Sequence, residues 1–286
     1  MSEAGKIQAA LRLGCNQLKF FSHTAILDAQ VLLAHILGRS KAWILAHPEF
    51  PLPINAQNDY ISALNRLCKG EPLPYVLGNW EFYGRQFKVD SRVLIPRPET
   101  EGLIEFGLNC IDRLDRPCTL LDVGTGSGCI AITFTIERPD ARVFAVDRSR
   151  AALTLAKENA YDHEVVEQIQ WVQGDLLSAM HARFDLIVAN LPYIPSTRLE
   201  HLSVGTHEPW EALDGGVQGL GLIKALIMQL PDRLAENGIA LLEIDESHGN
   251  DVIAFVKELF PMADVTLEPD LAGLDRYITI KGLKHD

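Results

Sequence analysis

Polar side chains that could bind a ligand stand at the ends of four short apolar segments. Three are carboxylates, Asp122, Asp147 and Asp175, and the fourth is the amide Asn190. Short apolar runs of this kind are typical of strands buried in a parallel sheet. The carboxyl ends of such strands meet at one edge, where open α/β folds bind ligands. We therefore expect these four side chains to share one site.

The first apolar segment runs directly into a glycine-rich loop. The loop consists of Gly124, Thr125, Gly126, Ser127 and Gly128, and the apolar residues 129–136 that follow are expected to form a helix. Glycines allow the backbone to turn tightly and to lie against a ligand, and the first amides of a helix attract its polar groups. A strand, a bare loop and a helix start together predict a nucleotide-type site.

Details of the loop indicate which nucleotide it binds. The spacing Gly-x-Gly-x-Gly departs from the Gly-x-Gly-x-x-Gly fingerprint of dinucleotide sites, since Cys129 stands at the last glycine position. Asp122 suits amine and hydroxyl donors better than a pyrophosphate. Asp147 lies 21 residues beyond Gly126 (147 − 126), close to the spacing at which a carboxylate meets ribose hydroxyls. An adenosine compound without phosphates is favoured, and S-adenosylmethionine fits.

The fourth strand end carries the tetrapeptide Asn190-Leu191-Pro192-Tyr193. Pro192 biases Leu191 toward an extended backbone, so the Leu191 carbonyl can point the same way as the Asn190 side-chain oxygen. Two such acceptors can hold both hydrogens of a planar NH2 group, and the ring of Tyr193 can stack on it. At the third strand end, Asp175 can accept from the adenine amine and Leu176 can pack on the base.

The elements that position these residues alternate in the manner of a doubly wound sheet. Strands are expected at 141–147, 169–173 and 184–189, and a helix at 151–160. Residues 6–70 have helical spacing, with Gly38 as a C-cap, and form a small separate domain. A hairpin is expected next, with strands 80–83 and 86–89 and its turn at Gly84-Arg85. Thr100 is expected to cap the helix that follows.

Composition narrows the class of protein. The formal net charge of −12 and the pI near 5.2 argue against broad nucleic-acid binding, which needs a positive surface. The five cysteines have no metal-ligand spacing, and we expect reduced thiols and no metal site. With neither a stretch of transmembrane length nor a signal peptide in view, the expected location is cytoplasmic, without membrane association.

In the tetrapeptide and in several other stretches the chain resembles a known family, the release factor glutamine methyltransferases. The Asn190 tetrapeptide is similar to the Asn/Asp-Pro-Pro-Tyr motif of methyltransferases that modify planar nitrogen. The supporting stretches are residues 78–84, 94–101, 122–128, 208–209, 212–216, 219–220 and 270–277. The resemblance implies an α/β fold: a seven-stranded, Rossmann-like class I methyltransferase domain (96–286) after a helical substrate-docking domain (1–73) and a β-hairpin linker (74–95). Residues 238–244 and 276–280 would be late strands.

The resemblance also implies an activity in translation termination. It is transfer of a methyl group from S-adenosylmethionine to the glutamine side-chain nitrogen in the Gly-Gly-Gln motif of peptide chain release factors. Asn190 and Tyr193 would be catalytic. Leu191 replaces the usual proline, and Leu176 stands where an aromatic residue is common. The alternatives are a ribosomal-protein glutamine methyltransferase, a DNA adenine-N6 methyltransferase and, least favoured, a non-enzymatic adapter.

Overall fold

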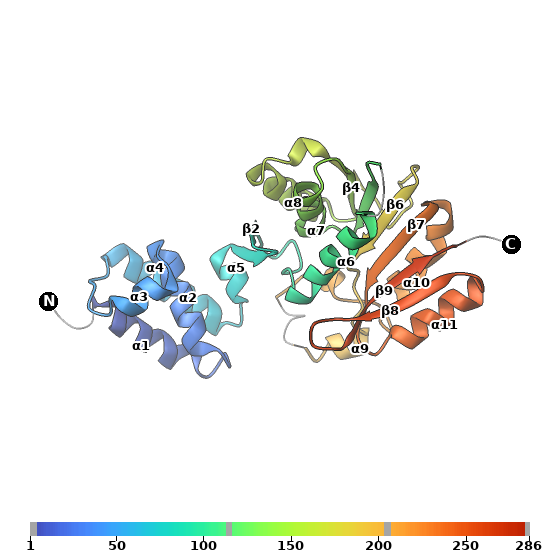
Figure 1. Ribbon diagram of the computed structural model, residues 1–286. Coiled ribbons are helices and arrows are strands. Elements are labelled where there is room, and N and C mark those ends of the chain that lie inside the picture. The colour runs from blue at the N-terminus through green and yellow to red at the C-terminus, as the bar shows by residue number, and fades with distance from the viewer. Residues whose placement is uncertain (1–4, 113–115, 203–206, 284–286) are drawn as a thin grey trace. The chain divides into compact units, whose positions relative to one another are not determined.

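The computed structural model describes residues 5–112, 116–202 and 207–283. The chain forms two compact units, the first ending at Asn79 and the second beginning at Trp80 (Figure 1). Each unit has an apolar core of its own. Among the described residues, no helix combines the length and the apolar composition that crossing a membrane requires.

The first unit is helical, as the spacing of its apolar residues predicts. Its helices are α1 (Ile7–Leu18), α2 (Ala25–Leu37), α3 (Lys41–Ala46), α4 (Ile54–Cys68) and α5 (Leu73–Leu77). Leu33 and Leu64 are fully buried between them, and the Tyr60 hydroxyl donates to the Ala29 carbonyl. Gly38 ends α2 in the left-handed conformation, as expected. Helix α5 was not predicted. Four of its five residues lie in the range 74–95, which was interpreted as a β-hairpin linker.

A two-residue turn closes the hairpin between β1 (Asn79–Phe82) and β2 (Arg85–Lys88). The turn residues are Tyr83 and Gly84, with φ of 51° and 69°. Positive φ at both positions is what a hairpin turn of the mirror-image type requires. The predicted turn at Gly84-Arg85 is therefore wrong by one residue. Tyr83 tolerates this conformation while its N–H donates to Glu101 Oε1 at 2.8 Å.

A seven-stranded sheet forms the centre of the second unit, in the order β5-β4-β3-β6-β7-β9-β8. The strands are β3 (Thr119–Val123), β4 (Arg142–Asp147), β5 (Ile169–Gln173), β6 (Phe184–Ala189), β7 (Leu234–Glu243), β8 (Asp264–Pro269) and β9 (Asp275–Lys281). The first five strands in this order pair in parallel, whereas β9 pairs antiparallel with both neighbours. The predicted strands are confirmed, and β7 begins earlier than expected.

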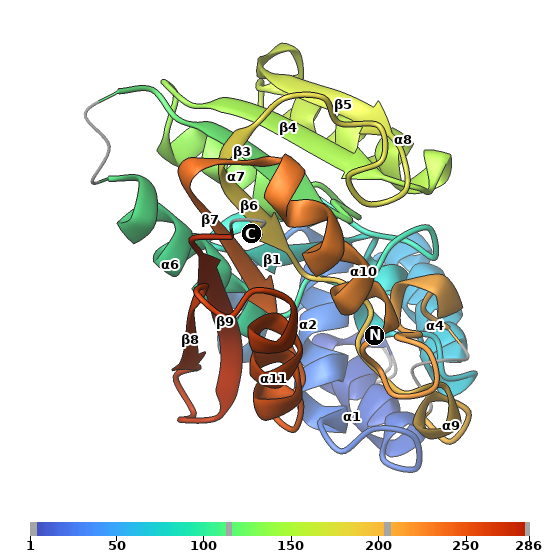
Figure 2. The same ribbon diagram turned by 90° about the vertical axis from the view of Figure 1, so that its right-hand side faces the viewer.

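Alternate residues of the central strands face two layers of helices. Leu121 and Val123 of β3 belong to the core under α10 (Gly221–Gln229) and α11 (Gly249–Leu259). Leu120 of the same strand belongs to the core under α6 (Glu101–Ile111), α7 (Cys129–Glu137) and α8 (Arg150–Asp162). Figure 2 shows α10 and α11 on one side of the sheet and α6 and α7 behind it. Burial on both faces explains why these strands are apolar throughout.

Candidate active site

A cavity lies at the carboxyl ends of β3, β4 and β6, where the order of the strands reverses. Such a reversal is the usual ligand site of an open parallel sheet. The predicted site residues that line the cavity are Gly124, Thr125, Gly126, Ser127, Asp147, Asp175, Leu176, Asn190, Leu191 and Pro192. Three predicted residues, Asp122, Gly128 and Tyr193, are not part of the lining. The structure thus brings most of the predicted residues together around one cavity, and the other three lie outside its lining.

The glycine loop takes its shape from backbone that only glycine adopts readily. Gly124, Gly126 and Gly128 have φ of 74°, 55° and 82°. The Gly126 N–H donates to Asp147 Oδ2 at 2.9 Å, and the Ser149 N–H donates to Asp147 Oδ1 at 2.8 Å. Burial raises the pKa of Asp147, although both backbone donors stabilise the charged form. Asp147 therefore supports the loop from the neighbouring strand and still lines the cavity.

Asp122 supports the loop from below. Its carboxyl is fully buried, and Oδ2 accepts the Thr125 hydroxyl at 2.6 Å and the Ala131 N–H at 3.2 Å. Burial raises the pKa of Asp122 to about 7. Gly128 is the residue before α7, and its N–H donates to the Thr125 carbonyl at 2.8 Å. These contacts fix the loop to the start of the helix, and direct contact of either residue with a cofactor stays a prediction.

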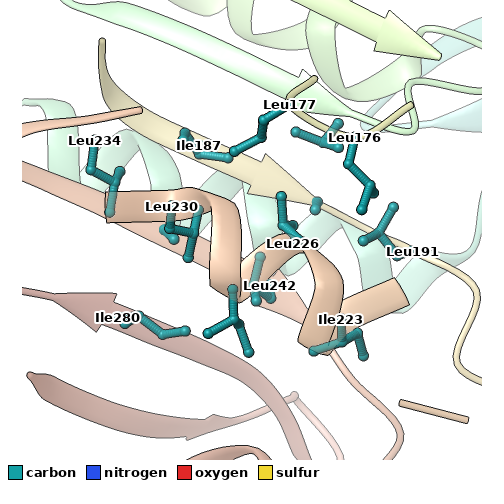
Figure 3. Packing of buried hydrophobic residues seen from close by; sticks show 14 of the residues in the cluster. Leu176, Leu177, Ile187, Leu191, Ile223, Leu226, Leu230, Leu234, Leu242 and Ile280 are labelled. Atoms are coloured by element: carbon teal, nitrogen blue, oxygen red, sulfur yellow. The ribbon is translucent and has the colours of Figure 1, made fainter. Parts of the chain in front are cut away.

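One wall of the cavity is apolar. Leu176 and Leu191 are buried, line the cavity and belong to the core cluster between β6 and α10. Figure 3 shows both side chains at one end of that cluster. Leu176 has φ of 48°, an unusual value for a leucine. Asp175 stands next to it, exposed at the rim. An apolar wall beside a rim carboxylate suits a flat base with an amine.

Asn190 is held from one side by a residue of a different element. Its Nδ2 donates to Thr100 Oγ1 at 2.9 Å, and Oδ1 has no donor among the described residues. Thr100 is buried at the end of the 3-10 helix Pro98–Thr100 (η2), just before α6. Its side chain makes no capping hydrogen bond to α6, so the predicted helix cap is wrong. The hydroxyl faces the strand ends instead.

Behind Asn190 lies a buried carboxyl that the sequence had not suggested. Glu243 at the end of β7 is 1% exposed, and burial raises its pKa to about 7. The Tyr193 hydroxyl donates to Glu243 Oε1 at 3.2 Å, and Oε2 has no hydrogen-bond partner among the described residues. Tyr193 therefore turns its hydroxyl away from the cavity, and its predicted part in catalysis stays a prediction.

Comparisons with known proteins agree with this arrangement. Residues 9–78 match the family model described as PrmC N-terminal domain, and residues 108–204 match the one described as Methyltransferase small domain. A release factor glutamine methyltransferase of Coxiella burnetii is 38% identical, over 96% of this chain and 98% of its own. One of Koribacter versatilis is 40% identical, over 88% of this chain and 89% of its own. The chain belongs to the release factor glutamine methyltransferase family.

A solved structure supports the fold. The catalytic domain of hMettl16, determined with an RNA hairpin, aligns over 82% of this chain and 84% of its own. The TM-score is 0.55 at 16% identity, a likeness that concerns the fold alone. The sheet, the helical first unit and the hairpin agree with the fold class inferred from the sequence. Membership of the family makes the chain an enzyme with a methyl donor of the S-adenosylmethionine type.

The charges around the cavity fit a nucleoside without phosphates. Three arginines line the cavity, and each lies close to a carboxylate: Arg92 with Asp90 and Glu158, Arg97 with Glu208, and Arg148 with Glu211. Paired guanidinium groups are poorly placed to bind a pyrophosphate. Within the described ranges no cluster of His, Cys, Asp and Glu is arranged to hold a metal ion. The carboxylates Asp147 and Asp175 and the Asn190 oxygen are acceptors, which suits a ligand that carries amines and hydroxyls.

Glu208 is a further residue whose role the sequence did not show. It is buried, and it accepts the Ile95 N–H at 3.1 Å and the Arg97 guanidinium at 2.5 Å. The segment that it holds contributes Val93, Leu94, Pro96 and Arg97 to the cavity lining. This proline-rich segment therefore forms part of the cavity wall. Its anchor lies more than a hundred residues away, beyond the reach of local patterns.

Proposed function

We propose that this chain transfers a methyl group from S-adenosylmethionine to the glutamine side-chain nitrogen in the Gly-Gly-Gln motif of peptide chain release factors. The observation that carries the proposal is the Asn190 amide at the end of β6. Its Nδ2 is engaged by Thr100, while Oδ1 lacks a donor among the described residues of a cavity that it lines. An acceptor held in this way fits a substrate NH2 group.

The residues present fit the proposed cofactor. The glycine loop presents bare backbone, Asp147 offers a carboxylate for the ribose hydroxyls, and Leu176 offers an apolar surface for adenine. Asp175 at the rim is the proposed acceptor for the adenine amine. When bound, the cofactor supplies a methyl group on a positively charged sulfur.

The chain's own contribution is to orient a weak nucleophile. Asn190 Oδ1 and the Leu191 carbonyl would accept the two hydrogens of the substrate amide, which localises the nitrogen lone pair toward the methyl group. Pro192 keeps the backbone of Leu191 extended, and the Tyr193 ring would pack against the flat amide. Orientation and charge placement then provide most of the rate, without a strong base before transfer. The sulfur would keep the electron pair of the broken carbon–sulfur bond, and the methylated nitrogen would afterwards lose one proton to water.

The first unit is the proposed docking module for the protein substrate. It matches the PrmC N-terminal domain model, and the connection from α1 to α2, together with the first turn of α2, exposes large apolar side chains. Phe20 is 77% exposed, Phe21 61% and Ile26 65%. Exposed aromatic residues of this kind are frequent anchors of protein interfaces. Because release factors act where proteins are synthesised, the proposed location is the cytoplasm, and no direct nucleic-acid binding is expected of this acidic chain.

Labelled S-adenosylmethionine tests the proposal against its two enzymatic rivals. The protein is incubated separately with purified release factor, with ribosomes and with duplex DNA, and the methylated residue is located by mass spectrometry. We expect label in the release factor, on the glutamine of Gly-Gly-Gln, and none when that glutamine is replaced by alanine. Label found only in a ribosomal protein or in adenine would reject the release factor as substrate.

A further inference from the structure

A buried amide lies behind the cavity, between two of its walls. Asn159 of α8 is 1% exposed and is not part of the cavity lining. Its Oδ1 accepts the Lys88 N–H at 2.7 Å, and its Nδ2 donates to the Lys88 carbonyl at 3.1 Å. The same Nδ2 donates to the Ser127 carbonyl at 2.8 Å. Both hydrogens of the Asn159 amide are therefore used, one on β2 of the hairpin and one on the glycine loop.

The partners of Asn159 fix the direction in which its amide points. Lys88 offers one backbone donor and one acceptor, and Ser127 offers an acceptor, so the amide oxygen faces the Lys88 N–H and the NH2 faces the two carbonyls. An ionised aspartate would lack both donors, and an apolar residue would leave all three backbone groups without this partner. Asparagine is a poor helix former, so these contacts, and not local propensity, explain its place inside α8.

Both segments that Asn159 holds belong to walls of the cavity. Ser127 lines the cavity itself, as part of the glycine loop. Lys88 comes four residues (92 − 88) before Arg92, the first residue of the wall that continues to Arg97. Arg92 is also tied to α8, because its guanidinium pairs with Glu158 at 3.1 Å. One helix therefore supports two walls of the cavity from behind.

We propose that Asn159 is a positioning residue for the cofactor, which acts by fixing the Ser127 carbonyl of the glycine loop to the hairpin strand β2. The hairpin is then a supporting part of the cofactor site and not only a linker. Without the amide, the free loop takes other arrangements, and the measured affinity falls in proportion to the fraction of molecules that keep the binding one. The inference rests on the proposed function for the cofactor, S-adenosylmethionine, and is independent of the protein substrate.

Three variants separate support of the loop from other effects. Asn159→Ala removes all three hydrogen bonds of the amide. Asp162→Asn loosens only the hairpin, because Asp162 of the same helix pairs with the Lys88 ammonium group at 2.7 Å. Asp185→Ala is the control for lost stability, since Asp185 also accepts a backbone N–H, from Thr119 at 2.9 Å. That contact lies at the amino ends of β3 and β6, outside the cavity lining.

Isothermal titration calorimetry with S-adenosylmethionine measures the effect. In Asn159→Ala we expect the Kd to rise about tenfold, which corresponds to a binding-competent loop in about one tenth of the free molecules. Asp162→Asn and Asp185→Ala should bind the cofactor like the wild type. An unchanged Kd in Asn159→Ala would overturn the proposal, and so would an equal rise in either of the other two variants.

Hydrogen exchange in the wild type decides the matter if Asn159→Ala does not fold. The Lys88 amide donates to Asn159 and lies outside the cavity lining, so a bound cofactor can slow its exchange only through the structure that joins it to the loop. We expect S-adenosylmethionine to slow exchange at Lys88 more than at Thr119, whose acceptor lies at the opposite ends of the strands. No slowing at Lys88, or equal slowing at both amides, would overturn the proposal.

These outcomes separate the inference from the proposed function. An unchanged Kd in Asn159→Ala, together with normal methylation of release factor by the wild type, would reject only the positioning role. Failure of the wild type to methylate release factor, with the Kd and the exchange rates changing as expected, would reject only the substrate.

Discussion

Replacing Asp147 by alanine is expected to weaken binding of S-adenosylmethionine. Each Asp147 oxygen already accepts one backbone N–H, from Gly126 at 2.9 Å and from Ser149 at 2.8 Å. Every carboxylate oxygen has a second acceptor site, and the cavity is where that site can be used. The change would therefore remove an acceptor for a ribose hydroxyl and release the amide that fixes the middle of the glycine loop.

The expected loss is about 1–3 kcal/mol, the range for a hydrogen bond to a charged group in a partly buried site. At roughly 1.4 kcal/mol per tenfold change, this corresponds to a Kd that is about 5- to 150-fold higher. Asp147→Asn should fall between the wild type and Asp147→Ala, since an amide has one oxygen and can accept from only one of the two backbone donors.

Isothermal titration calorimetry with S-adenosylmethionine measures the effect, after circular dichroism has shown that each variant is folded. Asp140→Ala serves as a matched control, because Asp140 precedes the same strand yet pairs with Arg138 at an exposed position outside the cavity lining. An unchanged Kd in Asp147→Ala, or an equal loss in Asp140→Ala, would refute the assignment of Asp147 to the cofactor site.

Four further predictions follow from the site and the first unit. Asn190→Ala should lower kcat by about a hundredfold at unchanged cofactor affinity, and a wild-type rate would reject the amide clamp. Leu191→Pro should retain most of the methylation rate, since it keeps the carbonyl. Because it removes packing by the leucine side chain, it should lower the free energy of unfolding measured in urea by about 1 kcal/mol. The pKa of Asp122 is raised from 3.8 to about 7, so its stabilising contribution is full below pH 3.8 and is lost as pH rises through about 7. Between these pH values the unfolding free energy of the wild type should therefore fall relative to that of Asp122→Asn. Parallel curves of unfolding free energy against pH for the two proteins would contradict this. Joint replacement of Phe20 and Phe21 by serine should raise KM for release factor by about tenfold or more without changing the Kd of the cofactor, and an unchanged KM would remove this surface from docking.

The strands that carry the site could be predicted because each one has a recognisable local sequence pattern. A short apolar run that ends in a carboxylate or an amide is visible at Asp122, Asp147 and Asn190 without any knowledge of partners. Strand β8 gives a weaker signal, because as the edge strand it alternates between exposed and half-buried residues. The turn at Tyr83 was placed one residue late because propensity does not favour an aromatic residue at positive φ.

The features of the site that the sequence did not predict depend mainly on contacts between segments far apart in the chain. Thr100 has the sequence context of a helix cap, but its hydroxyl accepts from Asn190, which follows β6 and lies 90 residues later in the chain. Glu208 supports a segment more than a hundred residues earlier in the chain. Glu243 has the same local pattern as Asp122, a carboxylate at the end of an apolar strand, but the strand that contains it was predicted from the resemblance alone.

The site is built on the ends of β3, β4 and β6, which are three adjacent strands in the middle of the sheet. The Asp147 carboxylate, at the end of β4, accepts a hydrogen bond from the loop that follows β3, so the residues that line the cavity are held together by the pairing of these strands. A ligand that binds only this assembled state adds its binding free energy to the stability of the second unit, about 2.7 kcal/mol at a hundredfold excess over Kd. Proteases act on the opened chain, and the fraction that opens sets how fast they destroy a protein. The lifetime of this enzyme would therefore depend on the supply of its own methyl donor, with unloaded molecules degraded first when that supply runs low.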